Sequence, residues 1–222
     1  MDIAQILRAA GRSSLTLWSL CTAMVLIATP LHGAKADEIR LLALGDSLSA
    51  GYGLARSDGF ADQLGRALRG EGLDVKVLNG GVSGETTAGG LARLDWMLSD
   101  EPDAVIVELG ANDGLRGLDP NETQANLDAI LNKLKQHNIP VLLTGMLAPP
   151  NMGSEYGEDF NGLYAMLANR HDVVFYPFFL EGVAGNLELN QEDAIHPNAK
   201  GVAEIIRRIL PSVKELLAQL SS

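Results

Sequence analysis

The sequence contains almost no cysteine. Its single cysteine, Cys21, lies in an apolar N-terminal stretch, so the remainder of the 222-residue chain offers no disulfide and no thiolate metal ligand. The common signatures of metal and nucleotide sites are missing too, among them H-E-x-x-H, the EF-hand loop, the P-loop and a G-x-G-x-x-G that opens a helix. We therefore expect no metal ion and no cofactor.

Residues 1–36 have the pattern of a secretory signal peptide. Two arginines precede a largely apolar stretch over residues 15–31, and Ala34-Lys35-Ala36 supplies the small residues of a cleavage site. The alternative is a retained membrane anchor, but about 17 apolar residues that include Pro30 are few for crossing a bilayer. We expect a mature domain over residues 37–222, exported to the periplasm and without stable membrane insertion.

The chain is poor in basic residues. It has 17 Lys and Arg against 28 Asp and Glu, and loss of residues 1–36, with three basic residues and one acidic residue, takes the formal net charge from -11 to -13. So acidic a domain binds nucleic acid and anionic membrane surfaces poorly. We expect a monomer that acts on a small-molecule substrate and recognises any lipid through an apolar pocket.

Short apolar runs alternate with longer amphipathic segments from residue 39 onward. We predict strands at 39–44, 75–78, 104–109, 141–144 and 173–176. We predict helices at 58–69, 87–98, 122–136, 156–168 and 199–220, the last as one helix or two around Pro211. The alternation indicates βαβ crossovers, and hence one three-layer α/β/α domain with a parallel sheet.

The first predicted strand ends in Gly45-Asp46-Ser47. Open α/β sheets carry their chemistry at this carboxyl edge, so the Ser47 hydroxyl is a candidate nucleophile. It needs a base, an orienting acid and an anion-stabilising pocket. A simple turn serine is the alternative. Ser49 stands where the G-x-S-x-G elbow of α/β-hydrolases has its second glycine, which excludes that family.

Two more predicted strands end in polar, glycine-containing turns, Asn79-Gly80-Gly81 and Gly110-Ala111-Asn112-Asp113. Because parallel strands share their carboxyl edge, these turns are expected beside Ser47. The N–H groups of Ser47 and Gly81 and the Asn112 amide could converge as an oxyanion hole. Otherwise Gly81 is part of an ordinary turn and Asn112 is a capping residue.

The segment Asp193-Ala194-Ile195-His196 supplies a candidate base and its orienting acid. An acid three residues before a histidine can bond one imidazole nitrogen and leave the other free to take a proton, as in a Ser-His-Asp triad. Histidine suits this role because its unperturbed pKa of about 6.5 lies near working pH. The alternative is a helix cap followed by a surface histidine.

Together these residues resemble the SGNH, or GDSL-type, hydrolase family. The matching blocks are Gly45 to Ser49, Gly81, Gly110 to Asp113 and Asp193 to His196, in family order. Three longer stretches are similar to the bacterial periplasmic multifunctional esterases: Gly45 to Gly53, Val107 to Gly117 and Ile195 to Asn198. These enzymes are described as acyl-CoA thioesterases, arylesterases, lysophospholipases and weak proteases. The resemblance implies a flavodoxin-like sheet of order 2-1-3-4-5, a catalytic triad of Ser47, His196 and Asp193, and a flexible loop at 114–119 that closes over the acyl chain.

We therefore interpret the chain as a hydrolase of carboxylic esters and thioesters that forms an acyl-enzyme. Six residues of predicted loops could line the acyl pocket, or could simply pack locally: Leu115, Leu118, Met146, Leu147, Met152 and Tyr156. A carbohydrate O-deacetylase with the same site is an alternative function. A non-catalytic periplasmic binding protein is another.

Overall fold

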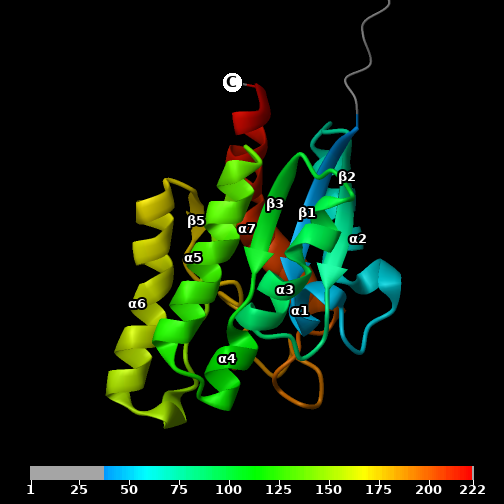
Figure 1. The fold of residues 1–222 in the computed structure, drawn as a ribbon. Coiled ribbons are helices and arrows are strands. Elements are labelled where there is room, and N and C mark those ends of the chain that lie inside the picture. The colour runs from blue at the N-terminus through cyan, green and yellow to red at the C-terminus, as the bar shows by residue number, and fades with distance from the viewer. Residues whose placement is uncertain (1–37, 222) are drawn as a thin grey trace, which may run out of the picture. The chain divides into compact units, whose positions relative to one another are not determined.

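A five-stranded parallel sheet forms the centre of the domain in the computed structural model, which describes residues 38–221 (Figure 1). The predicted signal segment, residues 1–36, lies outside this range. The strand order is β2-β1-β3-β4-β5, so both the parallel sheet and its order are confirmed. The strands are β1 (Ile39–Gly45), β2 (Val75–Gly81), β3 (Ala104–Glu108), β4 (Val141–Thr144) and β5 (Val174–Tyr176).

The central strands β1, β3 and β4 are almost continuously apolar and buried. A strand with helices over both of its faces has no solvent side, so unbroken apolar runs replace the alternation expected of a half-exposed strand. The edge strand β2 does reach solvent, where Lys76 and Asn79 are exposed. These patterns made the strands visible in the sequence.

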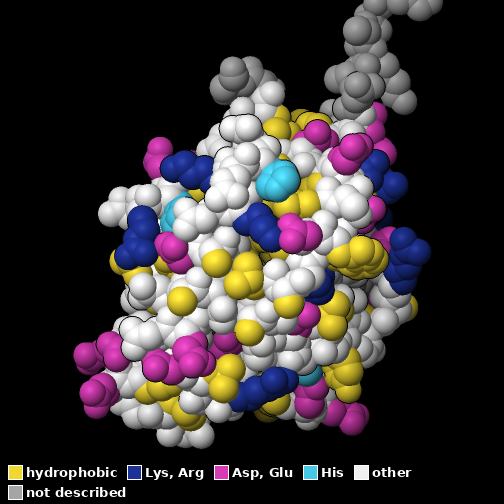
Figure 2. Space-filling model, in the orientation of Figure 1, with side chains coloured by type: hydrophobic (Ala, Val, Ile, Leu, Met, Phe, Trp, Pro, Cys, Tyr) yellow, Lys and Arg dark blue, Asp and Glu magenta, His cyan; other side chains and the backbone are white. Residues whose placement is uncertain are grey.

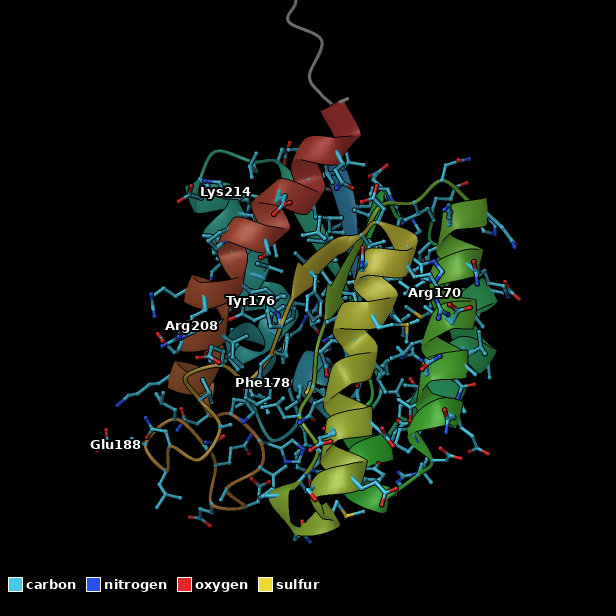
Figure 3. The ribbon with its side chains drawn as sticks, turned by 90° about the vertical axis from the view of Figure 1, so that its left-hand side faces the viewer. Arg170, Tyr176, Phe178, Glu188, Arg208 and Lys214 are labelled. Atoms are coloured by element: carbon cyan, nitrogen blue, oxygen red, sulfur yellow. The ribbon has the colours of Figure 1, made fainter. Side chains whose placement is uncertain are left out.

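Helices cover the sheet on both faces. In Figure 3, α7 lies on one side of the sheet and carries the labelled Arg208 and Lys214. Helices α5 and α6 lie on the other side, and α6 carries the labelled Arg170. Helix α2 packs against α7, and α5 packs against both α3 and α6. The longer helices are α2 (Phe60–Gly70), α3 (Thr87–Leu98), α5 (Pro120–Gln136), α6 (Ser154–His171) and α7 (Ala199–Ala218).

Helix α7 runs through Pro211 as one helix, which decides between the two sequence-based alternatives. Helix α5 begins two residues before the predicted start, because Asp119 accepts the Asn121 N–H and Pro120 occupies the first turn, where a proline is tolerated. No helix between residues 38 and 221 combines the length and the hydropathy that a bilayer span requires.

Two short helices lie at the carboxyl ends of the strands, α1 (Ser47–Ala50) after β1 and α4 (Ala111–Arg116) after β3. The sequence predicted plain turns here, and part of the predicted loop at 114–119 is therefore helical. Each helix is too short to show periodicity, and each ends at a glycine with positive φ, Gly51 (+77°) and Gly117 (+62°). In Figure 1 both lie below the strand ends, near the long segment that joins β5 to α7.

Three 3₁₀ turns complete the described elements: η1 (Arg56–Asp58), η2 (Pro150–Met152) and η3 (Gln219–Ser221). Figure 2 shows acidic side chains gathered at the lower left of that view, over the N-terminal end of α6. Glu155, Glu158 and Asp159 are exposed there. One group of acidic side chains thus lies near the strand-end edge of the domain.

Candidate active site

Ser47 is the first residue of helix α1, directly beyond the end of β1. Asp46 caps this helix, since its Oδ1 accepts the Leu48 N–H at 3.0 Å. Leu48 and Ser49 are buried, whereas Ser47 is only partly buried, and Ser47 and Leu48 line a cleft. The turn therefore presents the Ser47 hydroxyl at the carboxyl edge of the sheet, as the sequence pattern suggested.

Three of the predicted site residues form one hydrogen-bonded chain. His196 Nε2 lies 2.9 Å from Ser47 Oγ, and His196 Nδ1 lies 2.7 Å from Asp193 Oδ2. If the imidazole proton is on Nδ1 and is donated to Asp193, Nε2 can accept the proton of the Ser47 hydroxyl. This is the geometry that a nucleophile, a base and an orienting acid require.

Asp193 is held by the backbone of its own loop. Its Oδ1 accepts the N–H groups of Ile195 at 3.0 Å and of His196 at 2.9 Å. The His196 N–H, then the His196 ring, then the Ile195 N–H lower the pKa of Asp193 to about 2, so it is an anion at neutral pH. Ala194 between them adopts φ +58°, a left-handed conformation that costs an alanine on the order of 1 kcal/mol.

Two residues that sequence reasoning missed hold His196 in place. The Tyr52 ring lies against the imidazole, with 4.6 Å between ring centroids. Gln191 joins the two loops, because its Nε2 donates to the Tyr52 carbonyl at 2.7 Å and to the Pro197 carbonyl at 3.0 Å. Its own N–H donates to the His196 carbonyl at 2.7 Å. Tyr52 lies in the stretch 45–53 that carries the family resemblance, but nothing in the sequence assigned it a contact with His196, and Gln191 belongs to no recognisable motif.

Asn112 extends toward the same site from helix α4. Its Nδ2 donates one hydrogen to Asp46 Oδ2 at 2.9 Å, and its side chain lines the cleft. The amide keeps a second hydrogen for another acceptor. Asp46 is completely buried, and desolvation raises its pKa to about 6 although the Leu48 N–H and the Asn112 amide oppose the shift.

Gly81 does not join this group. It lies within β2, and its N–H donates to Asn79 Oδ1 at 2.9 Å. A Cβ at this position would lie 2.2 Å from the Ala50 nitrogen, so the glycine is needed for close packing of α1 on β2. Gly81 is absent from the cleft wall, whereas Gly84, three residues later and with φ +80°, lies in it.

The cleft beside Ser47 has a volume of about 700 Å³. Of the six residues predicted to line it, Leu115, Met146 and Leu147 do so. A second group reaches it from the segment between β5 and α7, where Figure 3 marks Phe178 beyond the end of β5. This group comprises Phe178, Leu180, Ala184, Gly185, Asn190, Ala194 and Ile195.

The other three predicted lining residues, Leu118, Met152 and Tyr156, lie outside the cleft wall. The Tyr156 hydroxyl donates to the Leu118 carbonyl at 2.9 Å, and Met152 packs so closely on Gly117 that a Cβ there would lie 2.6 Å from its Cε. These residues fasten the α4–α5 connection to η2 and α6. Among residues 38–221, no three His, Cys, Asp or Glu side chains are grouped so as to hold a metal ion.

Comparison with known proteins identifies the family of this chain. Residues 43–203 match the GDSL-like lipase/acylhydrolase family. The chain is 41% identical to esterase TesA of Pseudomonas aeruginosa, over 90% of this chain and 98% of the relative. It is 40% identical to thioesterase 1/protease 1/lysophospholipase L1 of Escherichia coli K12, over 79% and 82% of the two chains.

Solved structures give the same result. AlinE4, an SGNH-hydrolase family esterase, superimposes with a TM-score of 0.69 at 45% identity, over 80% of this chain and 96% of its own. A family match across most of the domain and relatives at about 40% identity establish the family of this chain. The chain belongs to the GDSL-like lipase/acylhydrolase family and is a hydrolase that acts on ester bonds.

Proposed function

We propose that the protein is a serine hydrolase of carboxylic esters and thioesters with an apolar acyl group, and that Ser47, His196 and Asp193 form its catalytic triad. The observation that supports this best is the continuous chain of hydrogen bonds from Ser47 Oγ through His196 to Asp193, at 2.9 and 2.7 Å, in the wall of an open cleft. Each group has the chemistry that its role demands.

In the proposed reaction, His196 Nε2 takes the Ser47 proton while Ser47 Oγ attacks the acyl carbonyl carbon. The tetrahedral intermediate collapses, the bond to the leaving oxygen or sulfur breaks, and His196 returns the proton to the leaving group. Water then attacks the acyl-enzyme with the same base, releases the carboxylic acid and restores the Ser47 hydroxyl. The Asp193 anion stabilises the imidazolium that forms in both steps.

For the oxyanion we propose three donors: the N–H groups of Ser47 and Gly84 and the free hydrogen of the Asn112 amide. In support, neither of these two backbone N–H groups has an acceptor among residues 38–221, whereas the Gly81 N–H already bonds Asn79. Gly84 and Asn112 both line the cleft. Donors that point at a developing negative charge supply much of the rate enhancement in acyl transfer.

The cleft supports an acyl chain as the group recognised. Its wall is largely apolar, its size suits a small hydrophobic ligand, and Leu115 and Leu147 are about half exposed there. The relatives are named esterase, arylesterase, thioesterase and lysophospholipase. We propose the same range of substrates for this chain, with the apolar acyl chain as their common feature.

The direct test is Ser47→Ala, which should lower kcat by about a thousandfold or more on p-nitrophenyl esters and acyl-CoA without loss of fold. Ser57→Ala, at an exposed serine of η1, is the matched control and should behave as wild type. Full activity of Ser47→Ala would remove the serine from the mechanism. Rates on acetyl-xylan that exceed those on octanoyl esters would favour the O-deacetylase alternative instead.

We also propose that residues 1–36 are removed on export and that the mature enzyme is a periplasmic monomer. The charged start, apolar stretch and small-residue cleavage site of the sequence support this. N-terminal sequencing of protein from the periplasmic fraction should begin at Asp37, and light scattering should give the mass of one mature chain. An uncleaved N-terminus in the membrane fraction would favour an anchor.

A further inference from the structure

A buried carboxyl group that takes no part in the proposed reaction lies directly behind the Ser47 turn. Glu108 is the last residue of β3 and is completely buried. Its Oε2 accepts the Ser49 hydroxyl at 2.8 Å and the N–H groups of Asp46 and Ser49, each at 3.3 Å. Glu108 therefore bonds the residues on both sides of Ser47 and does not touch the nucleophile itself.

These bonds determine which N–H of the turn stays free. Residues 46–50 carry five backbone N–H groups, and four of them have acceptors within the protein. Glu108 accepts two of them, and the side chain and carbonyl of Asp46 accept the other two. The one N–H left without an acceptor among the described residues is that of Ser47, which is the group needed for the oxyanion.

The first glycine of the Gly45-Asp46-Ser47 motif makes room for this carboxyl group. Gly45 lies opposite Glu108 in the register of β1 and β3. A Cβ at Gly45 would lie 2.5 Å from Glu108 Oε2 and 2.2 Å from Ser49 Oγ. Any side chain at position 45 would therefore displace the group that binds the turn, which gives this glycine a physical reason beyond turn geometry.

The surroundings of Glu108 favour its neutral form. Its second oxygen, Oε1, is buried and has no hydrogen-bond partner among the described residues. Burial, and then repulsion by Asp46, raise the pKa of Glu108 well above its usual range, although the bonds from Ser49 oppose this. The neutral acid can accept the same three bonds through its carbonyl oxygen, and it puts no negative charge behind the developing oxyanion.

No cation forms an ion pair with Glu108 among residues 38–221. Tyr164 on α6 is buried, with its hydroxyl on the Leu109 carbonyl at 3.1 Å. On α3, the Arg93 guanidinium bonds the Gly45 carbonyl at 3.1 Å, but it is also paired with Glu85. Among charged groups, Asp46 has the largest effect on the pKa of Glu108, and its repulsion disfavours a second anion.

We propose that Glu108 is a positioning residue of the esterase: a neutral glutamic acid that fixes the nucleophile turn through Asp46 and Ser49 and keeps the Ser47 N–H available to the oxyanion. This inference rests on the proposed role of Ser47 as nucleophile. It assigns a function to an acid that never meets the substrate.

Three variants test the proposal. Glu108→Ala should lower kcat by about a hundredfold, comparable to the loss of one oxyanion donor, with KM changed less than threefold. Glu108→Gln should keep kcat within about threefold of wild type, because an amide oxygen can accept the same bonds. Thr144→Val is the matched control: it removes a buried hydroxyl that bonds the Val107 carbonyl one strand away, and its kcat should equal that of wild type.

The pH dependence of stability supplies a readout independent of catalysis. A carboxyl group whose pKa is raised on folding stabilises the fold at acidic pH, and this contribution is lost as pH rises through the raised value. The melting temperature of Glu108→Gln, measured relative to that of wild type, should therefore increase as pH rises from 5 to 9. A constant difference over this range would show that Glu108 is not a neutral acid and would overturn that part of the proposal.

Labelling of Ser47 by a fluorophosphonate separates failure of this inference from failure of the proposed function. If wild type is active but unlabelled at Ser47, the triad assignment is wrong. If wild type is labelled and folded Glu108→Ala is labelled equally fast with unchanged kcat, Glu108 has no positioning role. Should Glu108→Ala not fold, Ser49→Ala, which removes one of the three bonds, decides: about fivefold slower labelling supports the proposal, and wild-type labelling refutes it.

Discussion

Two aspartates, Asp46 and Asp193, belong to the hydrogen-bonded surroundings of Ser47, and they differ in burial and in pKa. Asp46 is completely buried and its pKa is raised to about 6, first by desolvation. Asp193 has 38% of its side chain exposed, and hydrogen bonds from its own loop lower its pKa to about 2. Asp46 organises the backbone of the turn that carries Ser47, and in the proposed mechanism Asp193 is the anion that orients the base.

The two regions around these acids are also built differently. The loop of Asp193 is local: acid, backbone donors and imidazole lie within four residues, so the sequence already contains the arrangement. The turn at Asp46 is tertiary, since it depends on Glu108 and Asn112, more than sixty residues away. We therefore expect changes at Asp193 to affect chemistry with little loss of stability, and changes behind Ser47 to affect both.

The largest effect should come from Asp193→Asn. An asparagine cannot hold the imidazole in the reactive tautomer as the carboxylate does, so kcat should fall by about a thousandfold to ten-thousandfold. The neighbouring exposed acid offers a control, because Glu192→Gln changes the charge of the same loop without touching His196. If both variants lost activity equally, the loop charge rather than the Asp193–His196 bond would be responsible.

Asn112→Ala tests the Asn112 amide as a donor to the oxyanion. Removal of one oxyanion donor costs roughly a hundredfold to a thousandfold in kcat, and KM should change little. Asn132→Ala on α5 is a suitable control, because Asn132 is exposed and its amide donates to Asp128 Oδ2 at 2.9 Å, outside the cleft. An unchanged kcat for Asn112→Ala would leave Asp46 as its only partner and would remove it from the site.

The opposite pKa shifts predict opposite effects of pH on stability. The raised pKa of Asp46 gives a stabilising contribution, about 3 kcal/mol, that is lost as pH rises through about 6. The lowered pKa of Asp193 gives a smaller, solvent-screened contribution that is lost as pH falls toward about 2. Relative to wild type, Asp46→Asn should gain melting temperature from pH 4 to 7, and Asp193→Asn should gain it from pH 4 to 2.

If the two melting-temperature differences moved in the same direction with pH, the contrast between the buried and the exposed acid would be wrong. Urea denaturation at pH 4 and pH 7 provides a check that does not depend on heat capacity.

The smallest predicted effect comes from the surface acids, which act at a distance. With a formal net charge of -13 over residues 37–222 and exposed acids at the N-terminal end of α6, the enzyme should repel polyanionic acyl-CoA. Raising salt from 10 to 150 mM should increase kcat/KM for octanoyl-CoA about two- to fivefold by screening, and leave p-nitrophenyl octanoate unaffected. Equal salt dependence of both substrates would exclude this repulsion.

The sequence predicted the features that depend on residues close to one another in the chain. Apolar runs predicted all five strands, and glycine-rich turns after three of them indicated which edge carries the site. The short helices α1 and α4 were missed because four and six residues cannot display a 3.6-residue period. Their starts depend on caps and tertiary bonds instead.

The sequence alone could not distinguish the places of Gly81 and Gly84. Both are glycines in one short segment, and only the extent of β2 and the Asn79 bond show that Gly81 packs against α1 while Gly84 reaches the cleft. The sequence places Glu108 inside the predicted strand 104–109, and nothing in that apolar run indicates an acid with three bonds to a distant turn. Such roles arise only when strands become neighbours.

The most direct test of the central claim is the site of covalent labelling. Wild-type enzyme and His196→Ala should be treated with a fluorophosphonate, digested, and mapped by mass spectrometry. We predict a single adduct on the peptide that contains Ser47, formed at least a hundredfold more slowly in His196→Ala because the hydroxyl then has no base. An adduct on another residue, or an active wild-type enzyme that stays unlabelled, would contradict the account.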